Sequence, residues 1–397
     1  MADLTRDHAS FMPRFPALPI EARIVVLALC FRMVTAIVGF LANVTIPDYQ
    51  DQGFSVLPQP NPFWDRFARY DSGWYHSIAE DGYSFVEGRR LSNLAFFPLY
   101  PVLVGAVGRL FGGAQEDYYF AGIVISWLSF AAAMPLLYRL ARLDLPHDGA
   151  VRAMAYAAVF PSAYFFGVVY SEALFLLTLV GAALAFRTKH WMLAAIAAGA
   201  MTATRVNGVM FLPALGWLGW HAAGSSARDR ASAVGATAAG LMGIGAYSWF
   251  NYLISGNPFE WYHSITRWGY YPGGNPFLGL LAIGRELLTR PMQFIISEPM
   301  APYDTLNALT AAAALCLVPF IWRRFGFGYA AVVLLGLVLP LSSGQYEGLG
   351  RYCSVLFPLP ILLGGLKGET RHLGLITSFV LFYSLGLVLF GNVHPLF

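Results

Sequence analysis

An acidic residue stands in an aromatic-rich stretch between residues 69 and 83. Asp71 lies there at the start of a predicted short helix that Gly82 can end. A carboxylate in this setting can act as a general base that takes a proton from a hydroxyl group. A plain helix cap is the structural alternative for Asp71. Asp65, six residues earlier, is the reserve candidate for the base.

Arginines inside apolar tracts are the candidates for binding an anion. Arg205 and Arg351 interrupt such tracts, where a guanidinium group is costly unless it serves a purpose. The planar guanidinium fork fits the oxygens of a phosphate group. Snorkelling to a membrane interface, or pairing with a local acid such as Glu347, is the structural alternative. Arg267 is a third candidate.

Further polar residues accompany these arginines. Glu172 begins a predicted helix, where the dipole favours an acid, and it can also orient Arg205 or hydrogen-bond an acceptor. Asn207 can bind a sugar hydroxyl or satisfy the backbone of a broken helix. Tyr352 and His263 lie near the candidate arginines in sequence and complete the set of candidate substrate-binding residues.

The sequence predicts neither a metal site nor a nucleotide site. Its histidines and cysteines lack the spacings His-x-x-x-His and Cys-x-x-Cys, and Asp-x-Asp is missing as well. Metal-independent chemistry is therefore favoured, although distant acids such as Asp71 and Glu172 can together hold a divalent ion. The chain has no Walker lysine loop, which argues against ATP or a nucleotide sugar. A net charge of +3 gives no reason to expect nucleic acid.

The composition predicts an all-α polytopic membrane protein. Of the 397 residues, 57% are hydrophobic and 12% are charged, which leaves too little polar surface for a soluble globule. Apolar segments of membrane-crossing length predict about eleven spans in a single integral membrane domain that covers residues 1–397. The expected spans are 24–44, 118–138, 232–254, 305–322, 326–341, 352–366 and 372–391, with two helices in each of the interrupted tracts 150–187 and 191–221.

Loop charges predict how these spans are oriented. With the N-terminus in the cytoplasm, every inner loop is basic and the C-terminus lies outside. Residues 96–111 are apolar but short and proline-containing, so we expect a juxtamembrane helix on the outer side; a short ordinary span is the alternative. Two long aromatic-rich outer loops, 45–117 and 255–304, follow, and the first is the expected catalytic loop. This topology places the candidate acids and arginines on the outer side.

Three short motifs occupy the segment from residue 69 to 101. They are Arg69-Tyr70-Asp71, Ile78-Ala79-Glu80-Asp81-Gly82-Tyr83 and Ala95-Phe96-Phe97-Pro98-Leu99-Tyr100-Pro101. They resemble motifs of the phosphatidylinositol-glycan mannosyltransferase V (PIG-V) family and its bacterial relatives, with Tyr70 in place of the usual tryptophan. Later segments resemble further blocks of that family in the same order. These segments are 161–165, 170–175, 204–208, 350–352 and 357–358.

The resemblance implies a GT-C-type glycosyltransferase fold and a function. It implies a polyprenyl-phosphate-mannose-dependent mannosyltransferase in which an acid of the first external loop is the base, and that role falls on Asp71. The implied partners are a polyprenyl-phosphate sugar donor, an acceptor that is a glycolipid, a glycan or a protein, and the lipid bilayer. A hydroxyl that attacks the anomeric carbon opposite the phosphate would invert its configuration. Scarce lysine beside abundant arginine and alanine suggests a bacterial plasma membrane, with the active site extracytoplasmic.

Two other classes of function stay open on the sequence. A lipid-linked sugar flippase or transporter also has broken helices with polar residues. The chain shows no inverted repeat, and its polar breaks fall near one interface, which argues against transport. A non-catalytic subunit of a membrane complex is less favoured, because the outer loops are long, aromatic and acid-bearing.

Overall fold

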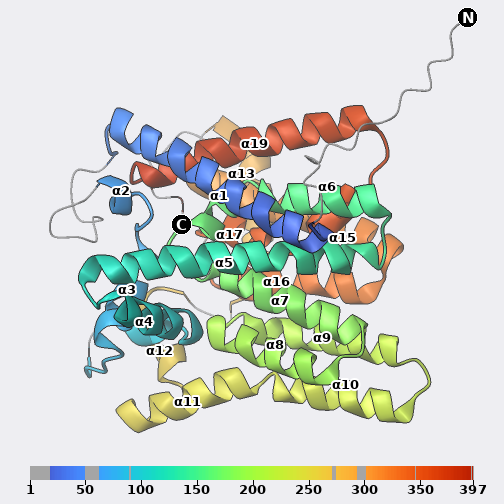
Figure 1. The fold of residues 1–397 in the computed structure, drawn as a ribbon, viewed down its shortest axis with the longest axis horizontal. Coiled ribbons are helices and arrows are strands. Elements are labelled where there is room, and N and C mark those ends of the chain that lie inside the picture. The colour runs from blue at the N-terminus through green and yellow to red at the C-terminus, as the bar shows by residue number, and fades with distance from the viewer. Residues whose placement is uncertain are drawn as a thin grey trace, which may run out of the picture.

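A computed structural model describes residues 18–49, 62–88, 91–270, 274–292, 301–344, 346–394 and 396. Within these residues the regular structure is entirely helical, without a strand (Figure 1). The elements are α1 (Ile20–Thr45), α2 (Pro62–Asp65), α3 (Asp71–Asp81), η1 (Asn93–Ala95), α4 (Leu99–Phe111), α5 (Gln115–Arg142), α6 (His147–Ala158), η2 (Ala163–Gly167), α7 (Glu172–Arg187), α8 (Trp191–Thr204), α9 (Gly208–Ala223), α10 (Ala227–Ala239), α11 (Met242–Ser255), α12 (Glu260–Arg267), α13 (Pro276–Thr289), α15 (Ala301–Phe325), α16 (Phe327–Ser342), α17 (Leu349–Ser354), α18 (Pro358–Gly364) and α19 (Glu369–Gly391).

Four helices among the described residues are long and apolar enough to cross a membrane: α1, α5, α15 from Tyr303 onward, and α19. The other apolar tracts are divided into shorter helices. The expected span 232–254 is broken between α10 and α11, where the Thr202 hydroxyl donates a 2.6 Å hydrogen bond to the carbonyl of Gly240. The expected span 352–366 is likewise divided into α17 and α18, because Pro358 lacks an N–H and starts a new helix.

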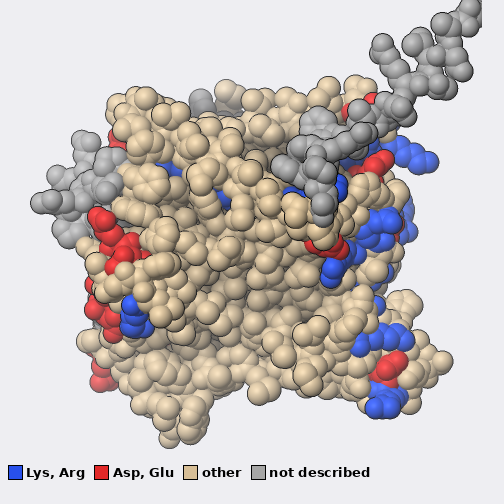
Figure 2. Space-filling view, in the orientation of Figure 1, with Lys and Arg blue, Asp and Glu red and all other residues tan. Residues whose placement is uncertain are grey.

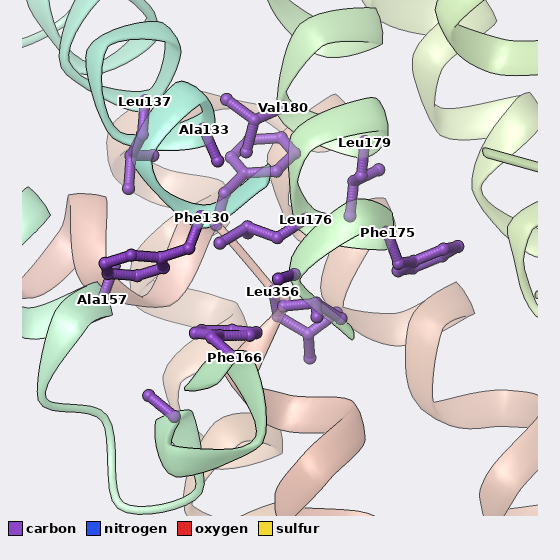
Figure 3. Packing of buried hydrophobic residues seen from close by; sticks show 14 of the residues in the cluster. Phe130, Ala133, Leu137, Ala157, Phe166, Phe175, Leu176, Leu179, Val180 and Leu356 are labelled. Carbon is purple, nitrogen blue, oxygen red and sulfur yellow. The ribbon is translucent and has the colours of Figure 1, made fainter. Parts of the chain in front are cut away.

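The core forms where the long helix α5 packs on the shorter helix α7. Figure 3 shows Phe130 and Leu137 of α5 beside Leu176 and Val180 of α7, with Phe166 of η2 close to them. Each of these five residues is fully buried. Burying such a side chain contributes about 1.5–3 kcal/mol relative to leaving it exposed to water. The α5–α7 contact therefore fixes the start of α7, where Glu172 lies, relative to the rest of the bundle.

The short helix α4 occupies the segment expected to lie at the membrane surface. It runs across the direction of α5 in Figure 1 and packs against both α3 and α5. Arg109 near its end donates a 3.2 Å hydrogen bond to the carbonyl of Ala79 in α3. The juxtamembrane interpretation of residues 96–111 stays a prediction.

Charged side chains gather at the two ends of the bundle. In the view of Figure 2 most of the lysine and arginine lies on the right, near the α5–α6 and α9–α10 connections, whereas the left end, over α3 and the start of α5, is rich in aspartate and glutamate. The helices between these ends expose mainly apolar side chains. An apolar belt between two charged ends is the pattern of an integral membrane protein.

Candidate functional site

The main cavity in the described part of the chain has a volume of about 980 Å³ and lies at the acidic end of the bundle. Its walls come from α3, α9, α11, α12, α16 and α17, together with the segments that follow η1, α8 and α12. Apolar side chains make up most of the lining, and a few charged groups are collected on one wall. This composition is typical of sites that bind amphipathic ligands.

Four of the candidate residues form one chain of charges on that wall. Arg351 Nη1 donates a 2.7 Å hydrogen bond to Asp71 Oδ2, and its Nε lies 3.2 Å from Glu172 Oε1. Arg205 Nη1 donates to the same Oε1 atom. The Glu172 side chain is 1% exposed, against 27% for Asp71. Two carboxylates and two guanidinium groups thus balance each other, with Glu172 buried behind the others.

Each member of this cluster lies at or near the end of a helix. Asp71 is the first residue of α3 and Glu172 is the first residue of α7. Arg205 leaves the helical conformation directly after α8, with φ −153° and ψ 145°. The next helix can start close by, because a Cβ atom on Gly208 would lie 2.8 Å from the carbonyl oxygen of Met201. The polar breaks in the apolar tracts therefore deliver the charged side chains to one place.

The backbone before Asp71 adopts a strained conformation that a single tyrosine holds in place. Tyr70 has φ 52° and ψ −112°, which costs about 1–3 kcal/mol for a non-glycine residue. The buried Tyr170 hydroxyl accepts a 3.3 Å hydrogen bond from the Asp71 N–H and donates a 3.2 Å hydrogen bond to the Arg69 carbonyl. These two bonds bracket Tyr70 and fix the direction in which α3 starts, so that Asp71 faces Arg351.

Asn207 and Tyr352 also line the cavity beside Arg205. The Arg205 guanidinium carbon lies 5.0 Å from the centroid of the Tyr352 ring, within cation–π range. Asn207 is 2% exposed, and its side-chain oxygen has no hydrogen-bond partner in the structure. A buried acceptor without a partner is costly unless a ligand supplies a donor, so Asn207 is available to a hydroxyl group.

The other candidates fall outside this arrangement. Arg267 and His263 belong to α12, but neither lines the cavity. Arg267 is held by Glu260, seven residues earlier on the same helix, and donates a 3.1 Å hydrogen bond to Ser264. His263 is exposed. Asp65 ends α2, and its side chain lies outside the described part of the structure.

Glu347 is a cavity residue that the sequence offered as a possible partner of Arg351. The structure pairs it instead with Tyr270, whose hydroxyl donates a 3.0 Å hydrogen bond to Glu347 Oε2. Burial, followed by the nearby Glu347 carboxylate, raises the pKa of Tyr270 well above its usual value. Nothing in the spacing of residues 347 and 351 could have told these two partners apart.

An aromatic wall completes the cavity. Trp74 of α3 stacks on Phe96 with ring centroids 5.9 Å apart and an interplanar angle of 12°, and it meets Trp268 edge-on at 5.1 Å. The Trp268 indole N–H donates a 3.1 Å hydrogen bond to the Ser92 carbonyl, which ties the residue after α12 to the residue before η1. Rigid aromatic faces with a few polar groups opposite them suit a ligand that has both apolar and hydroxyl surfaces.

The described residues contain no group of three or more His, Cys, Asp or Glu side chains that could hold a metal ion. The acids of the cavity are instead close to arginines or to a tyrosine hydroxyl.

Comparisons with known proteins add the fold class. The sequence matches no protein-family model and no curated protein. The structure is similar to that of ArnT from Cupriavidus metallidurans bound to undecaprenyl phosphate, with a TM-score of 0.51 and 12% identity over 94% of this chain and 77% of the other. It also resembles the archaeal oligosaccharyltransferase AglB from Archaeoglobus fulgidus in complex with an inhibitory peptide and a dolichol-phosphate, with a TM-score of 0.45 and 12% identity over 94% of this chain. The chain spans 56% of the length of that AglB chain.

These findings define the class of the molecule. The chain is an all-α integral membrane protein with the fold of GT-C membrane glycosyltransferases. The fold confirms the architecture that the motifs around residues 69–101 implied.

Proposed function

We propose that this protein transfers a sugar from a polyprenyl-phosphate donor to a hydroxyl group of an acceptor. One observation carries the proposal: the Asp71 carboxylate and the guanidinium groups of Arg205 and Arg351 line one cavity and are linked through Glu172. A proton acceptor beside two phosphate-binding cations is the set of groups that this reaction needs.

Asp71 is the proposed general base. Its side chain is the most exposed of the four charged groups and can reach an acceptor in the cavity. As the acceptor oxygen attacks the anomeric carbon, its proton passes to the Asp71 carboxylate, and the bond from that carbon to the phosphate oxygen breaks. Attack on the face opposite the phosphate inverts the configuration, so no covalent sugar–enzyme intermediate is needed.

Arg205 and Arg351 are the proposed phosphate ligands. The phosphodiester of the donor carries one negative charge, and the departing polyprenyl phosphate gains a second one as the sugar leaves. Fixed cations beside the phosphate stabilise this developing charge in the transition state. Glu172 forms ion pairs with both guanidinium groups and is a positioning residue. The Asp71–Arg351 ion pair must loosen when phosphate engages Arg351, which would free the base once the donor is in place.

Two features support a lipid-linked donor. Apolar residues of α11 and α16, including Ile244 and Leu339, line the cavity and offer a surface for a polyprenyl tail. The structure of ArnT, which has a similar fold, contains undecaprenyl phosphate. Mannose as the sugar follows from the motif resemblance at residues 69–101. The acidic end of the bundle, where the cavity lies, is the proposed extracytoplasmic side of a bacterial plasma membrane.

The test is incubation of the purified protein in lipid vesicles with labelled polyprenyl-phosphate-mannose and a lipid extract, followed by mass analysis of the products. A new glycosidic product with one added hexose, formed by the wild type but not by Asp71→Asn, supports the proposal. Counterflow of labelled lipid across the vesicle membrane without a new glycosidic bond would instead establish a flippase.

A further inference from the structure

Three arginines are fully buried outside the main cavity: Arg32, Arg66 and Arg69. The first two lie around one small cavity. Arg32 stands halfway along α1, and Arg66 directly follows α2; each is 1% exposed. The surroundings of Arg32 and Arg66 include α19, which contacts α1 and crosses it in the view of Figure 1. A buried guanidinium group in a membrane protein is expensive unless an opposite charge compensates it, so two such groups together need an explanation.

No carboxylate pairs with either arginine among the described side chains. Arg32 Nη1 donates to the Ala163 carbonyl at 3.2 Å and to the Tyr383 hydroxyl at 3.1 Å. Arg66 Nη1 donates to the Ala36 carbonyl. These acceptors satisfy individual N–H groups, but they supply only partial negative charge. Burial lowers the pKa of Arg66 to about 10, which leaves its guanidinium group charged at neutral pH.

Both arginines line one small cavity together with Tyr383. Their Nε atoms are buried and have no hydrogen-bond partner. The Tyr383 oxygen accepts from Arg32, which leaves the hydroxyl hydrogen of Tyr383 for another acceptor. The cavity volume is about 10 Å³, room for about one water-sized sphere. Positive charge and unused donors around a space for a single atom are the conditions for binding a small anion.

Aromatic rings cover the flat faces of the two guanidinium groups. The Arg32 guanidinium carbon lies 3.9 Å from the Phe130 ring centroid, and that of Arg66 lies 4.3 Å from the Phe67 centroid. Each group therefore has only its N–H edge left for a ligand. Gly39 makes room for Arg66, because a Cβ atom at that position would collide with the guanidinium group.

We propose that Arg32, Arg66 and Tyr383 bind one halide-sized anion, chloride under cellular conditions, as a structural ligand. The anion compensates the two buried charges and joins α1 and α19 to the segment that leads into α3. Arg66 is five residues before Asp71, so the anion steadies the chain just ahead of the proposed base. This site is separate from the main cavity and does not depend on the proposed sugar transfer.

The test compares thermal unfolding of the full-length protein in detergent, in sodium chloride and in sodium gluconate of equal ionic strength. With chloride at a hundred times its Kd, we expect Tm to be higher by about 3 °C or more. Bromide should replace chloride, and crystals soaked in bromide should show an anomalous-scattering peak between Arg32 and Arg66. Equal Tm values in chloride and gluconate, or no bromide peak at this place, would overturn the proposal.

Two variants and a control test whether the effect of chloride on Tm arises at this site. Arg66→Gln should abolish the difference in Tm between chloride and gluconate, and Tyr383→Phe, which removes one donor, should raise the half-saturating chloride concentration about tenfold. Arg139→Gln is the matched control, because Arg139 is an exposed arginine paired with Glu21, and its chloride response should equal that of the wild type. If Arg66→Gln does not fold, the Tyr383→Phe titration decides. An unchanged chloride response in Tyr383→Phe would contradict the assignment.

Discussion

Replacement of Asp71 by asparagine separates proton transfer from donor binding. The variant keeps the size of the side chain and an oxygen that can accept from Arg351, but it cannot take a proton. Loss of a positioned general base lowers turnover by about 10²–10⁴-fold. We therefore expect kcat for sugar transfer to fall by at least about a hundredfold in Asp71→Asn.

The structure also predicts what this variant preserves. Asparagine can still accept the hydrogen bond from Arg351, and Glu172 still compensates that guanidinium group, so the variant should lose only about 1 kcal/mol of folding stability. The net charge of the four-residue cluster rises from zero to +1, and Arg351 keeps Glu172 as its only carboxylate partner. Donor affinity should therefore stay equal to that of the wild type or become tighter.

The assay measures single-turnover rates and donor binding on the same vesicle preparation. Asp81→Asn is the matched control, because Asp81 ends the same helix and is exposed. Turnover of Asp71→Asn within tenfold of the wild type would refute the assignment of the base. Weakened donor binding in this variant would refute the idea that Asp71 and the phosphate compete for Arg351.

Three further variants probe the rest of the site. Arg205→Gln should weaken binding of the polyprenyl-phosphate donor by at least about tenfold in a titration, because a charged hydrogen bond to phosphate is lost; unchanged affinity would remove its phosphate role. Glu172→Gln should lower the free energy of unfolding by about 3 kcal/mol in denaturant titrations, since it leaves buried guanidinium charge uncompensated, and a loss below 1 kcal/mol would contradict that account. Tyr170→Phe should reduce kcat with little change in donor affinity, because it releases the backbone around Tyr70, and an equal loss in both would point to general misfolding. Arg267→Gln serves as the control for Arg205→Gln and should leave donor affinity unchanged.

Much of the fold could be predicted because the signals for it are local. Apolar length alone predicts α1, α5, α15 and α19, since each needs only a run of residues that favours lipid over water. The helix that starts at Asp71 and ends before Gly82 is also predicted by local signals, because an aspartate can begin a helix and a glycine can end one. The apolar runs do not predict the breaks that divide 232–254 and 352–366, because an apolar run does not show how a neighbouring helix will bond to its backbone.

The candidate site, like the fold, could be predicted from the sequence only in part. Arg205 and Arg267 look alike in sequence, since each follows a threonine and precedes an apolar or aromatic residue. The tertiary structure gives them different partners. Arg205 pairs with Glu172 of another helix, whereas Arg267 pairs with Glu260 of the same helix. The placement of Arg32 and Arg66 around one small cavity had no counterpart in the sequence motifs.

The sequence by itself determined that this protein is built from apolar helices, that basic loops mark one end, and which acids and arginines are available for chemistry. Only the tertiary structure decided which of those charges meet. Hydrophobicity is a property of each segment and can be read along the chain. An ion pair such as Asp71–Arg351 depends on two segments 280 residues apart, and their meeting is set by how the helices between them pack.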